Sequence, residues 1–254
     1  MSLSSAGYRE AVLVGINLPA YGQDLGLELC DAVEEACGVE GLDRIRLGSL
    51  EPDRLTEGVI RRLAAQPKLC PQFHLSLQSG CDNTLKAMNR HYTAAEYAAL
   101  VEKLRASFPN AAITTDVMVG FPGETEADFE SSLSFVRQIG FAKAHVFAYS
   151  RRPGTVADRM DSQVPRAEKE RRSHKMLLVA EESRRLFLNS QTGLCCNVLF
   201  ETAAHGGALE GYTENYTPVR VACGMENKGR LRAVRITGND GDCCQGVLVE
   251  KAPL

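Results

Sequence analysis

One apolar run that stops at a glycine–proline loop constrains the fold of this chain more than any other segment. Residues 111–125 read AAITTDVMVGFPGET, and the β-branched and apolar side chains end abruptly at Gly120. This pattern predicts a buried strand, a tight loop and the start of a helix. Such loops lie at the carboxyl end of parallel strands, where α/β folds bind their ligands. Asp116 interrupts the run, and a buried carboxylate needs a partner, so both a structural role and a role in a site are open.

Strand and helix patterns alternate on both sides of this segment. Apolar runs rich in β-branched residues occupy 10–17, 44–49, 73–78 and 144–149. Amphipathic stretches occupy 25–37, 55–66, 84–88, 93–107 and 126–139. This order predicts an α/β fold built on a parallel sheet. The first strand has no helix before it and would leave an open edge, so we expect that an amino-terminal strand is missing.

The pattern changes after Ser150. Pro165 precedes a predicted helix over 166–189. Five short strand patterns then follow between turns, at 196–201, 208–215, 217–223, 230–238 and 244–250. They predict a small barrel of the oligonucleotide-binding type. We therefore expect an α/β domain over 9–190 and an all-β domain over 191–254, preceded by an unstructured tag remnant over 1–8.

Positive charge is concentrated in the predicted connector. Residues 151–190 hold ten Lys or Arg and six Asp or Glu, whereas the whole chain has a net charge of −3. A basic connector could face an RNA backbone. A solvated helix rich in ion pairs is the simpler explanation of the charge pattern alone.

The sequence carries no membrane or secretion signal. No apolar run approaches the roughly 20 residues that a bilayer-spanning helix needs, and the start lacks the basic and apolar regions of a signal peptide. These observations predict a cytoplasmic protein without a membrane partner, in which the nine cysteines are reduced thiols.

The cysteines do not have the spacing of a metal site. Iron–sulfur clusters and zinc need closely spaced thiolates such as C-x-x-C, and no pair in this sequence has that spacing. Cys30 and Cys37 share one helix face, while Cys195-Cys196 and Cys243-Cys244 are vicinal on predicted strands, where neighbours point to opposite faces. We therefore predict no metal site from these residues.

Five motifs, in this order, resemble a known family: VLVGINLPAYG, RIRLGSLEP, FHLSLQSGCDNTLKAMNRHYT, ITTDVMVGFPGETEADF and VFAYSRRPGT. Together they are similar to the later part of the radical-SAM methylthiotransferases, from about Arg9 to the end. Residues 191–254 resemble the TRAM domain of that family, which binds RNA. The resemblance implies a partial (β/α) barrel that lacks its first strand, followed by a small all-β barrel.

The resemblance also implies cofactors and partners. Full-length members use S-adenosylmethionine and two [4Fe–4S] clusters, and they carry a C-x-x-x-C-x-x-C triad that is absent from this sequence. We expect a piece of a longer enzyme that is inactive by itself and holds neither S-adenosylmethionine nor a cluster. The implied partners are the anticodon stem-loop of tRNA and an electron donor such as flavodoxin or ferredoxin.

The substrate group follows from RIRLGSLEP, AITTDVMVGFPGET and GYTENYTPV, which look most like the group acting on N6-threonylcarbamoyladenosine. The implied reaction replaces the C2 hydrogen of that adenosine by a methylthio group through radical chemistry that the cofactor performs. Alternatives are enzymes for isopentenyladenosine in tRNA or for an aspartate of a ribosomal protein, and a non-catalytic RNA-binding module. A relative of coproporphyrinogen dehydrogenase shares the GFPGET loop, but the TRAM-like tail argues against it.

The resemblance assigns cofactor contacts to the ends of the strands and leaves the catalytic residues unassigned. Those expected to hold S-adenosylmethionine are Gly15, Asn17, Ser49, Gln78, Ser79, Gly120, Phe121, Pro122, Tyr149 and Arg151. Gly15 would let the backbone approach closely, and Asn17 would offer an amide. Ordinary strand-ending turns and loop caps are the alternative for these positions.

Substrate contacts are expected from Asp116, Arg152, Tyr212, Asn215 and Tyr216. Aromatic side chains beside polar groups suit stacking on unpaired bases, although Tyr is also common on ordinary strands. His74 and His145 lie in apolar strands, so we expect hydrogen-bonded barrel residues there. Cys81 stands where relatives would carry Ser, as a harmless replacement or as an oxidisable thiol.

Overall fold

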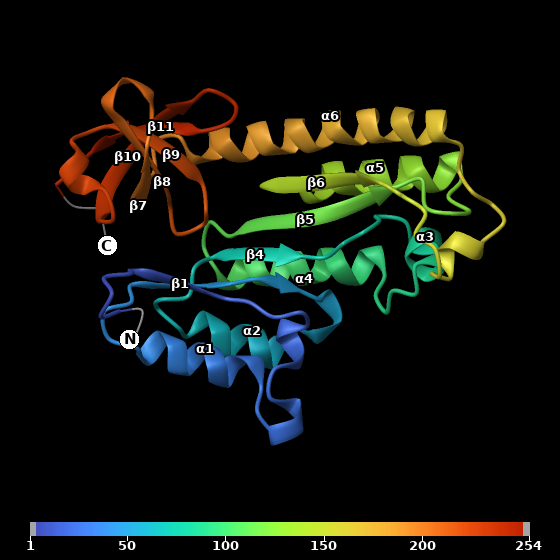
Figure 1. Ribbon diagram of the computed structural model, residues 1–254, viewed down its shortest axis with the longest axis horizontal. Coiled ribbons are helices and arrows are strands. Elements are labelled where there is room, and N and C mark those ends of the chain that lie inside the picture. Colours follow the sequence, from blue (N-terminus) through green and yellow to red (C-terminus); the bar gives the residue numbers. More distant parts are fainter. Residues whose placement is uncertain (1–3, 251–254) are drawn as a thin grey trace.

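The computed structural model describes residues 4–250, and its larger part is an open barrel of parallel strands (Figure 1). Its strands are β1 Glu10–Leu13, β2 Arg44–Leu47, β3 Ser49–Leu50, β4 Gln72–Leu75, β5 Ala112–Val119 and β6 Lys143–Ala148. β1 pairs with β2, and β3, β4, β5 and β6 pair in that order, all in parallel. We call this part the half-barrel; it confirms the predicted α/β class.

Helices cover one face of the half-barrel. They are α1 Leu29–Gly38, α2 Glu57–Ala64, α3 Asp82–Ala87, α4 Ala94–Ser107 and α5 Glu126–Ile139. Phe73, Ile113 and Val117 on this face of the strands are buried in the core with Tyr97 and Phe129 of the helices. The apolar side of each amphipathic helix therefore finds its partner in the sheet. The opposite face of the strands is open.

A long helix joins the half-barrel to a second body. α6 spans Arg166–Gln191, which is roughly 39 Å at 1.5 Å per residue. It packs along β6 and α5 and ends at the smaller barrel (Figure 1). The helix begins directly after Pro165, as predicted, because proline is compatible with a helix start but not with its interior.

The second body is a closed barrel of five strands. These are β7 Cys195–Ala203, β8 Ala208–Tyr212, β9 Pro218–Ala222, β10 Leu231–Asn239 and β11 Cys244–Leu248, in the spatial order β10-β11-β9-β8-β7. Its core is formed by Val198, Phe200, Leu209 and Val234, with Leu188 of α6 packed among them. We call this part the small barrel; the five predicted strands are all present.

Some predicted boundaries differ from the structure. β1 ends at Leu13 instead of continuing to Asn17, because its partner β2 ends at Leu47. α1 begins at Leu29 instead of Leu25, because Gly26 has a φ of 70° and Glu28 caps the helix together with Asp31. The third helix starts two residues earlier than predicted, at Asp82.

The two ends of the chain extend beyond residues 4–250, which are the residues that the structure describes. The tag remnant expected over 1–8 includes residues 1–3, and the domain expected over 191–254 includes residues 251–254; these seven lie outside the described residues. Residues 4–7 form a turn in which the Gly7 N–H donates to the Ser4 carbonyl over 3.0 Å.

None of the helices within residues 4–250 combines the length and the apolar character needed to cross a membrane. Between residues 4 and 250, no three His, Cys, Asp or Glu side chains converge in a way that could hold a metal ion. The nine cysteines are free thiols, and most of them are buried.

Candidate functional site

The loop after β5 is shaped by its own glutamate. Gly120 has a φ of 71°, a backbone conformation that favours glycine. Its N–H donates to the Glu124 carboxylate over 2.8 Å, and the Glu124 N–H donates to the Phe121 carbonyl over 3.0 Å. A Cβ at Gly120 would lie 2.5 Å from Cγ of Lys169 on α6. The loop thus folds back on itself at the carboxyl end of β5, tightly covered by α6.

A buried ion pair fastens this loop to α6. Arg172 donates to the Glu124 carboxylate over 2.7 Å and to the Glu124 carbonyl over 2.9 Å, and both side chains are almost fully buried. Burial raises the pKa of Glu124 above its ordinary value, against the opposing effects of the Gly120 N–H and Arg172. Arg172 also donates to Glu168 over 2.8 Å. The sequence motif contains Glu124, but nothing local in it indicates the partner 48 residues later.

A second carboxylate links this loop to the loop after β4. Asp128, in the first turn of α5, accepts hydrogen bonds from Thr125, Asn83 over 2.9 Å and the Cys81 thiol over 3.2 Å. Burial alone would raise the pKa of Asp128, but these hydrogen bonds outweigh it and hold the pKa well below its usual range. Cys81 is therefore a buried hydrogen-bond donor, and burial raises the pKa of its thiol.

Gln78 and Ser79 continue β4 toward the same end of the half-barrel. The Gln78 N–H donates to the Asp116 carbonyl over 2.9 Å, and Gln78 has a φ of 66°, which is unusual for a residue with a side chain. Its side-chain amide has no hydrogen-bond partner within residues 4–250 and is available to a ligand. Ser79 is fully buried, and its hydroxyl accepts from the Cys81 N–H over 3.2 Å, so it supports the loop.

A cavity of about 550 Å³ opens beside the ends of β5 and β6. Its walls include Met118, Phe147, Tyr149 and Arg152. The Tyr149 ring packs edge-on against Phe121, with ring centroids 5.3 Å apart. The Tyr149 hydroxyl is buried and has no hydrogen-bond partner among the described residues. The walls of this cavity are mainly apolar, which suits a flat ligand that carries polar groups at its edge.

Of the ten residues predicted to hold the cofactor, Tyr149 lines this cavity and the other nine do not. Gly15 and Asn17 are exposed in the loop after β1. Ser49 begins β3 instead of ending a strand, and it lies opposite His74 on the open face. Arg151 is held by its own loop, because it donates to the Asp158 carboxylate over 2.8 Å and to the Asp158 carbonyl over 2.7 Å. Pro122 is buried within the loop after β5.

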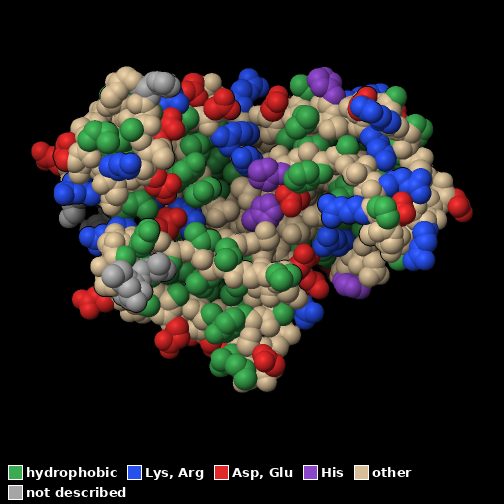
Figure 2. All heavy atoms as spheres, viewed as in Figure 1, with side chains coloured by type: hydrophobic (Ala, Val, Ile, Leu, Met, Phe, Trp, Pro, Cys, Tyr) green, Lys and Arg blue, Asp and Glu red, His purple; other side chains and the backbone are tan. Residues whose placement is uncertain are grey.

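Polar side chains line up across the open face, which Figure 2 shows with histidine in purple near its centre. His74, Thr114 and Lys143 are register partners on β4, β5 and β6, and Asp116 and His145 form the next pair. His74 lies 3.1 Å from the Thr114 hydroxyl and 3.5 Å from the Asp116 carboxylate. Desolvation and then Lys143 lower the pKa of His145, with Asp116 opposing. The expectation of hydrogen-bonded barrel residues is confirmed for His74.

The turn between β8 and β9 docks against the amino ends of β1 and β2. Arg46 donates to the Glu214 carbonyl over 2.7 Å and to the Thr213 carbonyl over 2.8 Å, and it pairs with Glu10 of β1 over 2.6 Å. Arg44 donates to the carbonyls of Tyr212 and Asn197. Two buried arginines of the half-barrel therefore satisfy the carbonyls of this turn.

Asn215 belongs to this interface. It is buried, and its amide donates to the Asn110 carbonyl over 3.0 Å and to Gln191 over 3.1 Å. Tyr216 is 47% exposed and stacks on Tyr212, with ring centroids 4.3 Å apart. The Arg46 guanidinium lies 4.7 Å from the centre of the Tyr216 ring. Of the three residues predicted to meet RNA here, Tyr216 is exposed, Tyr212 is half-buried and Asn215 is enclosed.

The charges of α6 are largely paired. Its arginines and lysines reach acidic residues of α5, of the preceding loop and of α6 itself, as in Arg166–Glu170 at 2.7 Å and Lys175–Glu130 at 3.0 Å. Glu168 accepts from Arg171 and Arg172, and the Arg171 hydrogen bond is the largest of the effects that lower its pKa to about 2. Four of the seven cations of α6 form ion pairs, so the ion-paired helix, which was the simpler explanation of the charge pattern, is confirmed in part.

The sequence matches a described family over more than half of its length. The profile of the radical SAM superfamily matches residues 3–136 of the 254-residue chain. These residues include β1 to β5, the loop after β5 and most of α5.

Curated relatives are tRNA-modifying enzymes. The tRNA-2-methylthio-N(6)-dimethylallyladenosine synthase of Streptomyces coelicolor is 46% identical over 183 residues, covering 71% of this chain and 36% of the relative. The enzyme of the same name from Caldicellulosiruptor saccharolyticus is 39% identical, over 92% of this chain and 50% of the relative. The threonylcarbamoyladenosine tRNA methylthiotransferase MtaB of Thermotoga maritima is 38% identical, over 83% and 48%. The chain thus spans half or less of the length of these relatives.

Solved structures resemble the chain in fold. Coproporphyrinogen III oxidase (HemN) from Escherichia coli superposes with a TM-score of 0.51 at 12% identity, over 85% of this chain and 55% of that one. The radical S-adenosylmethionine methyltransferase TsrM from Kitasatospora setae superposes with a TM-score of 0.50 at 15% identity, over 61% and 31%. At these identities the likeness concerns the fold alone.

Proposed function

The chain belongs to the radical SAM superfamily, and from this premise we propose that it is the barrel and carboxy-terminal part of a tRNA methylthiotransferase. The reaction proposed is replacement of the C2 hydrogen of N6-threonylcarbamoyladenosine, beside the anticodon, by a methylthio group. Two independent features support the proposal: the ligand-binding end of the half-barrel and the polar open face beside it.

The end of the half-barrel fits S-adenosylmethionine. The residues that would hold it are Gln78, with its free amide, the Gly120–Pro122 loop and Tyr149, whose buried hydroxyl lacks a partner among the described residues. Adenine suits the apolar walls that Met118 and Phe147 provide. When bound, this cofactor supplies the methyl group and the activation of an inert C–H bond. The part of this chain is to position the cofactor, and the Glu124–Arg172 pair holds the loop in place for it.

The cysteines of residues 4–250 do not fit an iron–sulfur cluster. Cys30, Cys37 and Cys70 are buried in the core, Cys81 donates to Asp128, and no three thiols converge. Because a [4Fe–4S] cluster needs several thiolates around one point, we assign none of these residues to it. We propose that the chain by itself does not cleave S-adenosylmethionine and that the complete enzyme uses two clusters and a flavodoxin- or ferredoxin-like donor.

The choice of substrate rests on the polar open face. A threonylcarbamoyl group carries an amide, a hydroxyl and a carboxylate, whereas a dimethylallyl group is a hydrocarbon. Lys143, His145, Asp116 and His74 would offer such a polar group hydrogen bonds and charge, and would leave a dimethylallyl group facing desolvated polar atoms. The dimethylallyl substrate is the second candidate, because relatives with identities above 40% carry that name.

RNA recognition would involve the small barrel, which we propose is a TRAM domain. Tyr216 is 47% exposed and forms an aromatic and cationic cluster with Tyr212 and Arg46. This arrangement is suited to stacking on an unpaired base of the anticodon loop. Arg152, exposed at the rim of the cavity, would contact the same RNA near the cofactor. We propose a cytoplasmic location, because the proposed substrate is a tRNA.

The test is mass spectrometry of tRNA nucleosides from the source organism after deletion of the complete gene. We expect the methylthio form of N6-threonylcarbamoyladenosine to disappear and the form without the methylthio group to accumulate. Reintroduction of the gene should restore the modification, while a gene with Gly120→Val should not, because Gly120 has a positive φ and no space for a side chain. Loss of the methylthio group from the dimethylallyl nucleoside would instead favour the second candidate.

A further inference from the structure

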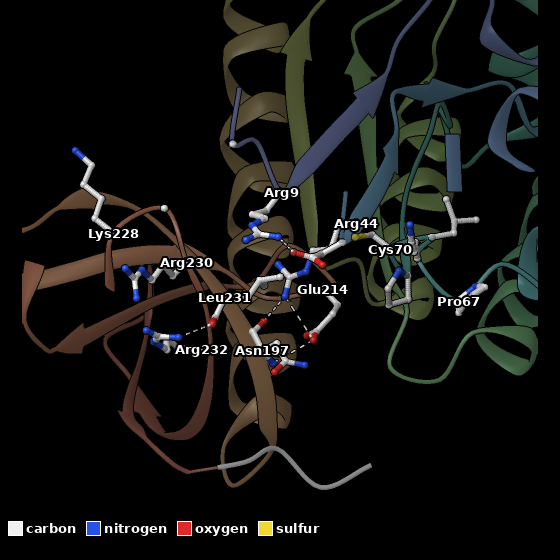
Figure 3. A pocket seen from close by; sticks show the side chains of 16 residues that line it. Arg9, Arg44, Pro67, Cys70, Asn197, Glu214, Lys228, Arg230, Leu231 and Arg232 are labelled. Atoms are coloured by element: carbon white, nitrogen blue, oxygen red, sulfur yellow. Dashed lines mark hydrogen bonds and ion pairs between the residues drawn. The ribbon is translucent and has the colours of Figure 1, made fainter. Parts of the chain in front are cut away.

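A large basic cleft lies between the half-barrel and the small barrel, away from the proposed cofactor site. Its volume is about 1040 Å³, and the side chains that surround it are drawn in Figure 3. Six cations line it, namely Arg9, Arg44, Lys68, Lys228, Arg230 and Arg232, against only two carboxylates, those of Asp43 and Glu214. From this excess of positive charge we infer that the cleft binds consecutive phosphates of an RNA strand.

Both carboxylates of the cleft already form ion pairs with arginines of the protein. Asp43 lies 3.6 Å from Arg9, and Glu214 lies 3.4 Å from the buried Arg44. Within residues 4–250, Lys228 and Arg230 have no side-chain hydrogen bond or ion pair. Figure 3 shows both on the small barrel, with Lys228 extending away from the protein. Two unpaired cations two residues apart, backed by Arg232, form a surface that attracts an anion without first breaking an ion pair.

This surface differs from the basic connector that the charge pattern indicates. On α6 four of the seven cations are ion-paired with glutamates, and Lys169 and Arg184 donate to backbone carbonyls, so less of their charge is available. The chain as a whole is acidic, with a net charge of −3. A concentration of unpaired positive charge at one place on an acidic protein therefore points to a specific polyanionic partner.

The position of the cleft favours RNA over a small anion. Its cations come from both bodies: Arg9, Arg44 and Lys68 from the half-barrel, and the other three from the small barrel. It lies at the amino ends of β1 and β2, whereas the proposed cofactor site lies at the carboxyl ends of the strands. The eight residues of β5 span roughly 26 Å from the amino end to the carboxyl end of the strand. A nucleic acid is long enough to contact both, and the choice of RNA rests on the proposed function.

The experiment measures binding of the chain to a short fluorescein-labelled RNA hairpin by fluorescence anisotropy at several salt concentrations. The test variant is Lys228→Ala/Arg230→Ala. Its matched control is Lys103→Ala/Arg61→Ala, which removes the same charges from exposed positions on α4 and α2. All four residues are exposed, so both variants should fold like the parent, which circular dichroism checks.

We expect the cleft variant to bind RNA about tenfold more weakly. The plot of log K against log salt should flatten by roughly 1.4, at about 0.7 for each single-strand phosphate that is no longer neutralised. The control variant should keep the parent affinity and slope. Equal weakening in both variants, unchanged binding in the cleft variant or no RNA binding by the parent would overturn the inference. Binding of polyglutamate with the same affinity as RNA would also overturn it. If the strain without the gene keeps its methylthio nucleosides, the proposed reaction is refuted, but the measurement of RNA binding to the cleft is unaffected.

Discussion

Arg172 on α6 closes the loop after β5 by donating to the carboxylate of Glu124 over 2.7 Å, in a contact from which water is almost completely excluded. The same carboxylate accepts the Gly120 N–H. One buried acid therefore sets the loop conformation and ties it to the connector helix. Since α6 also carries the small barrel, the geometry of the proposed cofactor site depends on a helix that the fold uses to join its two bodies.

Breaking this pair should be costly. Arg172→Leu leaves the Glu124 carboxylate buried without its partner, and we expect a decrease of about 3–5 kcal/mol in the free energy of unfolding, measured by urea titration. The double variant Arg172→Leu/Glu124→Gln removes both charges and should recover much of that decrease. If the double variant is as unstable as the sum of the two single variants, the pair is not coupled and its role in holding the loop is wrong.

Asp128 should determine part of the dependence of protein stability on acidic pH. Burial would raise its pKa, but the hydrogen bonds to the carboxylate outweigh burial, so the pKa lies below the ordinary value of 3.8. The stability it contributes is therefore complete above its ordinary pKa and is lost as the pH falls through the lowered pKa of the folded state. Asp128→Asn should cost about 2 kcal/mol at neutral pH, and the difference from the parent should shrink in acid. Asp161→Asn, which changes an exposed carboxylate, should match the parent throughout the titration.

Tyr149 and Tyr97 should respond differently to removal of the hydroxyl. The Tyr97 hydroxyl donates to the Leu75 carbonyl over 3.1 Å, so Tyr97→Phe should lower the free energy of unfolding by about 1 kcal/mol. The Tyr149 hydroxyl has no partner in the described chain, so Tyr149→Phe should not destabilise the protein. Because we assign that hydroxyl to the cofactor, Tyr149→Phe in the complete enzyme should weaken S-adenosylmethionine binding about threefold to tenfold by calorimetry. Unchanged affinity would remove Tyr149 from the site.

Asn215 and Tyr216 are neighbours with different expected roles. Asn215→Ala should destabilise the chain by about 1–3 kcal/mol, because it removes buried hydrogen bonds to the Asn110 carbonyl and to Gln191. Tyr216→Ala removes the contacts with Tyr212 and Arg46 and should cost about 1 kcal/mol in stability, and it should weaken RNA binding about tenfold. Denaturation and anisotropy on both variants separate the two effects. The reverse pattern would place the RNA contact at Asn215.

Local signals predicted much of the fold. α5 spans Glu126–Ile139 as predicted, because Thr125 caps its start and Gly140, with a φ of 64°, ends it. Thr93 and Glu96 form the expected capping box of α4. These signals lie within a few residues of the boundary they set, so the sequence alone reveals them. The N-cap of α1 is Glu28, a residue less common in that role. The predicted start of this helix is therefore four residues too early.

The contacts between distant residues could not be predicted in the same way. Glu124 and Arg172 are 48 residues apart, and Arg44 meets Tyr212 across 168 residues. The basic cleft draws on residues 9 to 232, so no window of sequence shows its charge. Conversely, five of the ten cations in the basic window 151–190 form ion pairs, with acidic residues of α5, of the loop before it and of the window itself. Charge along a sequence and charge on a surface differ for this reason.

The substrate assignment is tested most directly with the purified complete enzyme, S-adenosylmethionine and a reductant. Two tRNAs are supplied in equal amounts, one carrying N6-threonylcarbamoyladenosine and one carrying the dimethylallyl nucleoside, and methylthio products are followed by mass spectrometry. We predict at least about tenfold faster conversion of the threonylcarbamoyl substrate, and loss of that preference in His145→Phe, which removes a polar group from the open face. Equal conversion of both tRNAs, or faster conversion of the dimethylallyl one by the parent enzyme, would contradict the proposed substrate.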